Sequence, residues 1–300
     1  NYKDGAWDKG ALTGDDQVTI NECAGVLQYA QTVFEGMKAY TTEDGRIVIF
    51  RPDLNASRMA DSARRLEMPV YPDEKSVEAV EQVVRANAAW VPPYGSGATL
   101  YLRPYMFGTN AVIGVKPADE YQFRVFATPV GPYIKGGVKP LTIRVSDFDR
   151  AAPHGTGHIK AGLNYAMSLH AIVTAHAEGY DESMYLDAAT DTKVEETGGA
   201  NCRFVTKDGK VVTPKSDSIL PSITRRSLMY VAKEYLGLEA EEREIAFDEV
   251  KDFAECGLCG TAAVISPVGR IVDHGQEICF PAGMETMGPV TQKLYDTLTG

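Results

Sequence analysis

The chain has 300 residues, 44% hydrophobic and 24% charged, a composition typical of globular proteins and long enough for two domains, each with its own core. Its formal net charge of −11 disfavours a nucleic-acid-binding surface, which needs basic side chains to neutralise phosphates. No apolar run approaches the roughly 20 residues of a membrane-spanning helix, and the first residues do not resemble a signal peptide. We therefore expect a protein that acts on small molecules.

The first elements predicted along the chain are a hairpin and two helices. Residues 39–50 are expected to form a β-hairpin, since Asp44-Gly45, a pair typical of a tight hairpin turn, precedes the strand-like residues 47–50. Apolar residues then recur at helical spacing, with Asp53 as the predicted N-cap and Pro69 as the end of the run. A second helix is expected from about residue 76 to residue 91, where two prolines follow.

The middle of the chain predicts two strands and a boundary between domains. The strands are expected over residues 99–103 and 123–127. Prolines and glycines cluster in the residues that follow, a composition typical of a linker. We therefore predict a small N-terminal α/β domain over 1–128, a linker over 129–137 and a C-terminal domain over 138–300.

The second half predicts alternating strands and helices. Gly179 is the expected C-terminal stop of one helix, Ser222 is the expected N-cap of another, and Asp208-Gly209 is the turn of a second hairpin. Free backbone N–H groups at the start of the Ser222-capped helix are suited to holding a phosphate. The elements expected here are strands at 141–145, 182–187, 194–199, 204–206 and 210–212, and helices at 161–178 and 223–236.

Lys160 lies in a glycine-rich segment, residues 155–165, and this segment is the most informative in the chain. A lysine shielded from water can lose its proton and attack an aldehyde, which indicates a Schiff base with pyridoxal phosphate. Two other glycine-loop functions are excluded. A P-loop needs Gly-Lys followed by Ser or Thr, and Lys160 instead stands between Ile159 and Ala161; a dinucleotide fingerprint would need its third glycine at position 160.

The five cysteines are odd in number and scattered, which favours reduced thiols and a cytoplasmic location. Cys256 and Cys259 have the spacing of a redox pair or of half a zinc site. No second pair lies at zinc-ribbon distance, so we predict buried thiols without a role in chemistry and no metal site.

Several motifs in a fixed order identify a resemblance that covers nearly the whole chain. They occupy residues 33–40, 51–53, 101–104, 128–133, 155–165, 219–226 and 259–263. In this order they resemble the branched-chain amino acid aminotransferases, which are fold-type-IV pyridoxal phosphate enzymes. The resemblance implies a two-domain α+β fold with a smaller N-terminal α/β domain and a larger, β-rich C-terminal domain that carries helices.

The resemblance also assigns cofactor-binding residues. Lys160 would bind the cofactor covalently and move the proton between the substrate Cα and the cofactor. Glu196, rather than its neighbour Glu195, would face the pyridine nitrogen and keep it protonated. Tyr165 would donate to the phenolic oxygen. The other implied contacts are Arg65 and, as a second candidate, Arg150 at the 5′-phosphate, the backbone N–H groups of Ile223 and Thr224, the hydroxyl of Thr261, and Leu220 against the ring.

For the substrate, the resemblance implies an apolar pocket that also accepts a dicarboxylate. The walls would be Phe34, Tyr29, Tyr133 and Tyr165. Arg103, with Tyr101 and Tyr29, would pair with the distal carboxylate of 2-oxoglutarate, and the backbone at Thr261 and Ala262 would hold the α-carboxylate. Members of this family form homodimers, so Tyr29, Ile113 and Val115 are implied to act across a subunit interface.

The implied reaction is transfer of the amino group of L-leucine, L-isoleucine or L-valine to 2-oxoglutarate by a ping-pong mechanism. D-amino acid aminotransferases and aminodeoxychorismate lyases share the fold and the same lysine and carboxylate, so they remain alternatives, as does a non-catalytic binding protein. One position departs from many relatives: Gly199 replaces a threonine behind the pyridine ring. The sequence does not rank the three branched-chain substrates.

Overall fold

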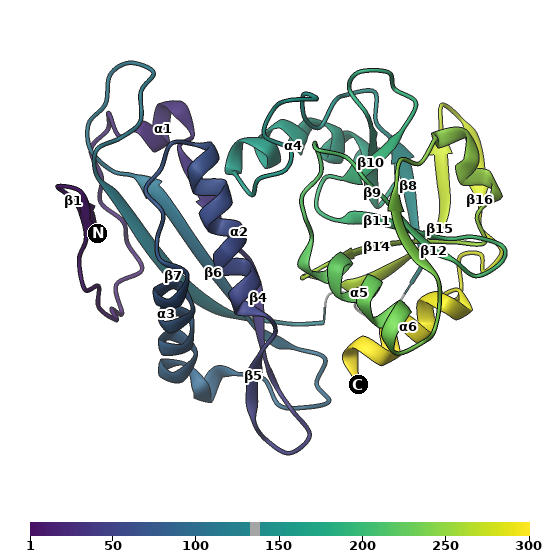
Figure 1. The fold of residues 1–300 in the computed structure, drawn as a ribbon, viewed down its shortest axis with the longest axis horizontal. Helices are drawn as coiled ribbons and strands as arrows, with labels where there is room; N and C mark the ends of the chain where they lie inside the picture. The colour runs from purple at the N-terminus through teal and green to yellow at the C-terminus, as the bar shows by residue number, and fades with distance from the viewer. Residues whose placement is uncertain (133–138) are drawn as a thin grey trace. The chain divides into compact units, whose positions relative to one another are not determined.

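The computed structural model describes residues 1–132 and 139–300, which fall into two compact units (Figure 1). Unit 1 contains residues 1–132 together with Ile159–Leu163, and unit 2 contains residues 139–158 and 164–300. Both units combine strands and helices, which confirms the predicted α+β class. Part of the predicted linker, including Tyr133, lies outside the described residues, so the domain boundaries at 128 and 138 stay a prediction.

Unit 1 is built on one sheet whose strands lie in the order β2-β1-β7-β6-β4-β5, with β3 paired to β6. Its elements are β1 (Tyr2–Lys3), β2 (Ala6–Trp7), α1 (Gly25–Tyr29), β3 (Thr32–Phe34), β4 (Met37–Thr41), β5 (Ile47–Ile49), α2 (Pro52–Arg65), α3 (Asp73–Ala86), η1 (Ala88–Trp90), β6 (Thr99–Gly108) and β7 (Tyr121–Val130).

Alternation along β6 gives the sheet of unit 1 two different faces. Leu100 and Leu102 are buried and pack with Val80 and Val84 of α3, so this face forms a core under the helices (Figure 1). Side chains of successive strand residues point to opposite faces, so Tyr101 and its odd-numbered neighbours belong to the other face. The helices therefore stabilise one face and leave the other to polar and aromatic residues.

The first hairpin is confirmed by the pairing of β4 with β5, and Gly45 has the positive φ of 80° that the turn requires. Two predicted helix boundaries were wrong. Asp53 is not the N-cap of α2: Arg51 holds that position, and Pro52 with its fixed φ opens the helix. The helix ends at Arg65, before Pro69, because Glu67 takes a left-handed conformation.

Three further predictions in unit 1 differ from the structure in extent. The helix α3 begins at Asp73 and ends at Ala86, which is earlier than the predicted range of 76–91. Strand β6 runs to Gly108 and β7 to Val130, so both are longer than the sequence suggested. Pairing of the two strands along their whole length maintains β6 beyond Pro104, which has no N–H to donate.

Unit 2 is built on a second, mixed sheet with the strand order β10-β9-β8-β15-β14-β11-β12-β13, and β16 is paired to β15. Its elements are β8 (Leu141–Val145), α4 (Gly162–Ala177), β9 (Glu182–Leu186), β10 (Val194–Thr197), β11 (Asn201–Val205), β12 (Val211–Pro214), α5 (Ile223–Glu234), β13 (Ala240–Arg243), η2 (Phe247–Asp252), β14 (Glu255–Gly260), β15 (Val264–Asp273), β16 (Gln276–Cys279) and α6 (Pro289–Thr299).

The sheet of unit 2 closes on itself because β10 also pairs with β11, so that Glu196 lies opposite Asn201. The closed ring surrounds a core of buried apolar side chains that includes Ile143, Met184 and Phe204. Apart from α4, whose first two residues belong to unit 1, the helices of this half flank the ring (Figure 1). Closure removes two free sheet edges and fixes the polar residues of β10 and β11 firmly in place.

Several predicted elements of the second half are confirmed. Helix α4 ends at Ala177, and Gly179 follows with φ 87°, the left-handed conformation expected of a C-terminal stop. The second hairpin joins β11 to β12, and Gly209 has φ 88° in its turn. The hydroxyl of Ser222 caps α5 by accepting the N–H of Arg225 at 3.1 Å.

The C-terminal helix α6, which the sequence reading did not predict, is attached by buried polar contacts. Glu255 is 5% exposed and accepts the backbone N–H groups of Val290 and Thr291 at 2.9 and 2.8 Å. The hydroxyl of Thr291 donates to Glu255 at 2.6 Å and accepts from the buried Arg203 at 2.7 Å. The carboxylate of Glu255 on β14 therefore satisfies the start of the helix, and Thr291 links the helix to Arg203 on β11.

No helix in the described part of the chain is long and apolar enough to cross a membrane.

Replacing Glu255 by alanine is expected to destabilise the protein by about 3 kcal/mol, because two buried N–H groups and a hydroxyl lose their acceptor. The measurement is the urea midpoint of purified protein. Glu277→Ala is a suitable control, since Glu277 is 51% exposed in its pair with Arg270 and its loss should cost less than about 1 kcal/mol. Equal midpoints for the two variants would contradict this account of α6.

Candidate active site

The backbone of Lys160 is hydrogen-bonded on both sides to residues of unit 1. Its N–H donates to the buried hydroxyl of Ser62 at 3.0 Å, and its carbonyl accepts the N–H of Phe34 at 3.0 Å. Ile159 and Ala161 on either side are fully buried in the core of the unit. Lys160 is only partly buried, and its Nζ lies 4.8 Å from the centre of the Phe34 ring. Backbone pairing therefore fixes a lysine beside an aromatic wall.

Arg103 lies close to the same aromatic ring. Its Cζ is 4.7 Å from the centre of Phe34, and its Nη2 and Nε donate to the hydroxyl of Tyr101 at 2.8 and 3.3 Å. A Cβ at Gly36 would collide with that hydroxyl, so the close approach of Tyr101 requires glycine there. The predicted residues Lys160, Phe34, Tyr101 and Arg103 thus form one cluster, with two cations around an apolar ring.

Glu35 anchors this cluster, and the sequence reading gave it no role. It is 1% exposed, accepts from Arg58 at 2.8 and 2.7 Å and accepts from Asn55 at 2.7 Å. Its N–H donates to the carbonyl of Pro104 at 2.7 Å. A buried ion pair with further hydrogen bonds resists displacement, so Glu35 fixes the position of Phe34 beside it. A glutamate between an apolar residue and a glycine was the available signal.

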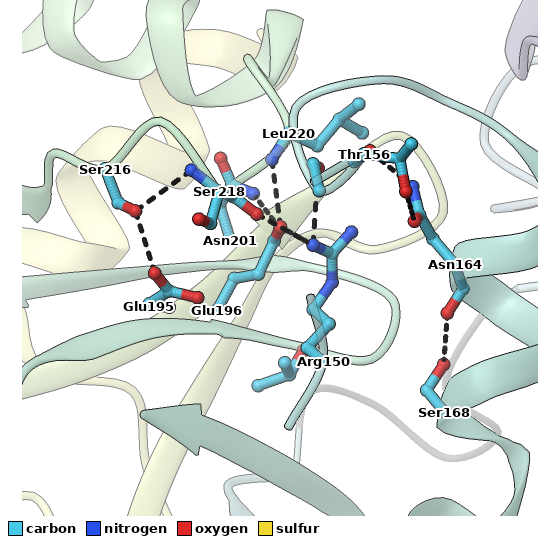
Figure 2. Close-up of polar contacts among 12 residues, drawn as sticks. Arg150, Thr156, Asn164, Ser168, Glu195, Glu196, Asn201, Ser216, Ser218 and Leu220 are labelled. Atoms are coloured by element: carbon cyan, nitrogen blue, oxygen red, sulfur yellow. Dashed lines mark hydrogen bonds and ion pairs between the residues drawn. The ribbon is translucent and has the colours of Figure 1, made fainter. Parts of the chain in front are cut away.

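Glu196 is the centre of a second cluster, in unit 2 (Figure 2). It is 2% exposed, and one carboxylate oxygen accepts from the N–H of Leu220 and from Arg150, both at 2.9 Å. The other oxygen accepts from Asn201 at 2.6 Å. The neighbouring Glu195 instead accepts from the hydroxyl of Ser216 at 2.8 Å. The two adjacent carboxylates therefore have separate environments, as expected for successive strand residues.

Burial raises the pKa of the Glu196 carboxyl to about 7, although the nearby Arg150 and the N–H of Leu220 act in the opposite direction. Burial likewise raises the pKa of Glu195. A carboxyl group that titrates near neutrality without contact with solvent is typical of a functional site. Glu196 is poised to pair with a further positive charge.

Arg150 is used inside this cluster. It is 3% exposed, and besides Glu196 its Nη1 donates to the carbonyls of Ser218 and Gly157 at 3.0 and 3.3 Å. A Cβ at Gly157 would overlap the backbone of Ser218, so only glycine permits this approach. Arg150 was predicted as a second phosphate candidate; the structure places its guanidinium against Glu196, where it ties the Gly157 and Ser218 loops together (Figure 2).

The remaining predicted residues lie at element ends. Ile223 and Thr224 open α5 and are both 8% exposed, so their N–H groups lie where a helix start can hold an anion. Thr261 and Ala262 form the turn after β14, and Tyr165 is near the start of α4.

Arg65 is the last residue of α2, and Tyr29, 40% exposed, accepts the N–H of Gly114 at 3.0 Å. Tyr133 lies outside the described residues.

Cys256 and Cys259 do not face one another. Both lie on β14, three residues apart, so they point to opposite faces; Cys256 packs in the core of the ring and Cys259 packs under α5 and α6. Burial raises the pKa of both thiols, to about 11 for Cys259. The prediction of buried thiols is confirmed. The described residues contain no group of three His, Cys, Asp or Glu arranged to hold a metal ion.

Comparison with known proteins identifies the family of this chain. The family model for class IV amino-transferases matches residues 32–271. A branched-chain-amino-acid aminotransferase of Haemophilus influenzae is 51% identical over 305 residues, covering 100% of this chain and 89% of that protein. The chain therefore belongs to the class IV aminotransferase family, which confirms the resemblance read from its motifs.

Solved structures agree as well. A branched-chain aminotransferase from Thermoproteus uzoniensis, solved with norvaline, has a TM-score of 0.83 and 29% identity, over 97% of this chain and 91% of that one. Another branched-chain amino acid aminotransferase, solved with pyridoxamine 5′-phosphate, has the same TM-score, identity and coverage. These likenesses extend over both units of the chain.

The raised pKa of Glu196 predicts a pH dependence of stability for the cofactor-free protein. A folded-state pKa near 7, above the usual value of 4.5, means that the folded state holds the proton more tightly. The associated stability is therefore present below about pH 4.5 and is lost as the pH rises through 7, by up to about 3 kcal/mol.

Urea unfolding between pH 4.5 and 8 measures this effect. In Glu196→Gln the side chain does not titrate, so the difference in stability between the wild type and this variant should change in favour of the wild type as the pH falls. Glu249→Gln, which alters a partly exposed pair with Arg243, is the control. Parallel curves for the wild type and Glu196→Gln would mean that Glu196 does not titrate in this range.

Proposed function

We propose that the protein is a pyridoxal-phosphate-dependent branched-chain aminotransferase. It moves the amino group of L-leucine, L-isoleucine or L-valine to 2-oxoglutarate and releases a branched-chain 2-oxo acid and L-glutamate. Full-length similarity to relatives of that name supports the reaction. The structural observation that carries it is the cluster around Phe34, where the Lys160 amine and the Arg103 guanidinium lie 4.8 and 4.7 Å from the centre of one apolar ring.

The residues of unit 2 fit the cofactor. Bound pyridoxal phosphate supplies an electron sink for the charge left when Cα of the substrate loses its proton. The buried Glu196 carboxylate suits a protonated pyridine nitrogen, since that cation offsets the cost of burying its charge. The N–H groups of Ile223 and Thr224 and the hydroxyl of Thr261 would hold the phosphate. Arg65, which belongs to unit 1, is proposed as a further phosphate ligand. Leu220 would pack on the ring, and Tyr165 would donate to the phenolic oxygen.

Arg150 acts through Glu196 rather than on the phosphate. Its guanidinium lowers the pKa of that carboxyl against the effect of burial, so the ionised form is available to the pyridine nitrogen. The contacts of Arg150 with Gly157 and Ser218 also hold the two loops beside Glu196. Arg150 is therefore a positioning residue.

Lys160 is the catalytic residue of this proposal. Its backbone is fixed by Ser62 and Phe34, so its flexible side chain is the part that moves. The amine would move a proton from Cα of the amino acid to C4′ of the cofactor, and it would reverse this transfer for the oxo acid. The ring of Phe34 excludes water on one side of the amine.

The branched-chain amino acid and 2-oxoglutarate require one surface that accepts both an aliphatic side chain and a carboxylate. The ring of Phe34 accepts the aliphatic side chain of leucine, isoleucine or valine, as Tyr29 would on another wall. Arg103, oriented by Tyr101, pairs with the distal carboxylate of 2-oxoglutarate. The backbone at Thr261 and Ala262 would hold the α-carboxylate, which both substrates share.

A coupled transamination assay of the pyridoxal-phosphate-loaded protein tests this function. With 2-oxoglutarate as acceptor, we expect turnover of the three branched L-amino acids and little of D-alanine or L-aspartate. Lys160→Ala should lower the rate by about a thousandfold or more, because the proton carrier is lost. The matched control is Lys75→Ala on α3, which should retain wild-type activity. A preference for D-alanine would indicate a D-amino acid aminotransferase, and absence of any turnover would favour a lyase or a binding protein.

We further propose that the enzyme is a cytoplasmic homodimer. All five cysteines are free, which suits a reducing compartment. Ile113 and Val115 are 89% and 91% exposed in the isolated chain, and the turn between them is joined to Tyr29 by the Gly114 N–H. Two fully exposed β-branched residues on a braced loop are typical of an interface, and here they are proposed to contact a second copy beside Tyr29.

The double variant Ile113→Asp, Val115→Asp is expected to shift the protein from dimer to monomer, because the new charges oppose burial of the loop. Light scattering after size-exclusion chromatography measures the mass. Leu12→Asp, at another exposed apolar position, serves as the control and should leave the mass unchanged. A wild type that is already monomeric, or a double variant that remains dimeric, would contradict the assignment of this loop.

A further inference from the structure

The strand that carries Glu196 contains a β-bulge. The register of β10 against β9 shifts between Val194 and Thr197, and Glu196 lies in the shifted segment. A bulge interrupts the ladder of hydrogen bonds and redirects the side chains at that point. The direction of Glu196 therefore depends on where the strand resumes its pairing, which is at Thr197, its last residue.

A two-residue turn follows immediately. The N–H of Thr197 donates to the carbonyl of Ala200 at 3.0 Å, and the hydroxyl of Thr197 accepts the N–H of Ala200 at 3.2 Å. Gly198 and Gly199 are the two residues of the turn. Because Glu196 directly precedes Thr197, a displacement of this turn displaces the end of the bulge and with it the Glu196 carboxylate.

Glu182, the first residue of β9, lies against this turn. A Cβ at Gly198 would be 3.4 Å from its Oε1, and a Cβ at Gly199 would be 3.9 Å from its Oε2. The carboxylate therefore has one oxygen beside each glycine. Its Oε1 accepts the N–H of Ser183 at 2.8 Å. Burial raises the pKa of Glu182, whereas hydrogen bonds from the N–H groups of Ser183 and Gly198 favour the ionised form.

Backbone N–H groups, rather than a cationic side chain, are the main partners of this half-buried carboxylate. Among the described residues, no lysine or arginine lowers the pKa of Glu182; besides the two N–H groups, His176 acts in that direction. A salt bridge therefore does not explain the position of Glu182. Hydrogen bonds from N–H groups to a carboxylate are stronger than neutral ones, so they are suited to holding a turn in place.

The turn also adjoins a second part of the proposed cofactor site. A Cβ at Gly260, the last residue of β14, would be 3.9 Å from the carbonyl oxygen of Gly199 and from the Cβ of Ala200. Gly260 directly precedes Thr261, whose hydroxyl is proposed to hold the phosphate. The turn beside Glu182 is therefore connected to Glu196 along the chain and is packed close to the segment of Thr261.

We propose that Glu182 is a positioning residue of the cofactor site: by accepting hydrogen bonds from the turn, its carboxylate holds Glu196 where it pairs with the protonated ring nitrogen of pyridoxal phosphate. This inference rests on the proposed function, in which Glu196 faces that nitrogen. Glu182 acts through the backbone and is assigned no contact with the cofactor. A displaced Glu196 would form a longer and less aligned hydrogen bond, which is weaker.

Two cofactors that differ at one ring position test this role. Pyridoxal phosphate has the ring nitrogen, and its 1-deaza analogue has a C–H group there, whereas the aldehyde, the phenolic oxygen and the phosphate are the same. Calorimetric titration of the full-length, cofactor-free protein with each compound gives two Kd values. Their ratio isolates the contribution of the ring nitrogen, and the wild type should prefer pyridoxal phosphate.

In Glu182→Ala, pyridoxal phosphate should bind about tenfold more weakly, while binding of the analogue changes by less than about threefold. Glu182→Gln keeps an acceptor oxygen and should bind both compounds within about threefold of the wild type. Glu178→Ala is the control, since Glu178 is 49% exposed in its pair with Arg144, and it should match the wild type in both titrations.

Glu182→Asp covers the case in which the alanine variant does not fold. It keeps the charge and withdraws the carboxylate from the turn by one methylene group, so pyridoxal phosphate should again lose more affinity than the analogue. Far-UV circular dichroism of each cofactor-free variant checks the fold.

Equal weakening of both compounds in Glu182→Ala or Glu182→Asp would indicate a structural role and overturn the proposal, as would unchanged binding of pyridoxal phosphate. A loss in Glu182→Gln as large as in Glu182→Ala would also overturn it, because hydrogen bonds would then not be what holds the turn.

Glu196→Gln is the reference and should lose most of the wild-type preference for pyridoxal phosphate over the analogue. The same wild-type preparation, loaded with pyridoxal phosphate, is assayed with L-leucine and 2-oxoglutarate. Absence of that activity, or a preference unchanged in Glu196→Gln, would count against the proposed function, whereas the Glu182 variants decide the role of Glu182 alone.

Discussion

The buried carboxylate of Glu196 is the constraint on which the second unit depends. A carboxylate out of contact with water needs a donor for each oxygen, and here the donors come from three parts of the chain: Arg150, Asn201 and Leu220. Each donor fixes its own segment. Arg150 holds the loop before Lys160 through Gly157, Asn201 belongs to the strand that closes the ring, and Leu220 precedes α5. The polar site and the closed sheet therefore stabilise one another.

In the first unit, strand alternation determines which polar side chains face away from the core. One set of alternate residues, such as Leu100 and Leu102, forms the core under the helices, so the residues between them are directed to the other face without any further device. Lys160 follows this rule outside a strand, since Ile159 and Ala161 are buried on either side of it. The ion pair of Glu35 with Arg58 then fixes the segment that carries Phe34. Core packing thus determines which side chains are available for chemistry.

Local signals in the sequence were sufficient for the elements that depend on neighbouring residues. The Asp44-Gly45 and Asp208-Gly209 turns, the Ser222 cap and the Gly179 stop were all predicted because each acts within a few residues. The cap of α2 was misread, since Asp53 is a good capping residue but Pro52 fits the first helical position better.

Features that depend on distant pairing were not accessible from the sequence. The contact of Arg150 with Glu196, the burial of Glu35 and the attachment of α6 to Glu255 join residues far apart in the chain. The lysine segment and the Glu196 strand were nevertheless found, because the family motifs record the outcome of such pairing. The two faces occupied by Cys256 and Cys259 followed only once their segment was known to be a strand.

Desolvation shifts the pKa of a buried acid and of a buried amine in opposite directions and brings both toward neutral pH. Burial raises the pKa of Glu196 to about 7 and lowers that of Lys38 to about 8, because in each case the charged form loses water. The Glu196 carboxyl is therefore ionised at small cost when a positive charge is bound beside it and is neutral at small cost when that charge is absent. In the proposed function that positive charge would be the protonated ring nitrogen of the cofactor.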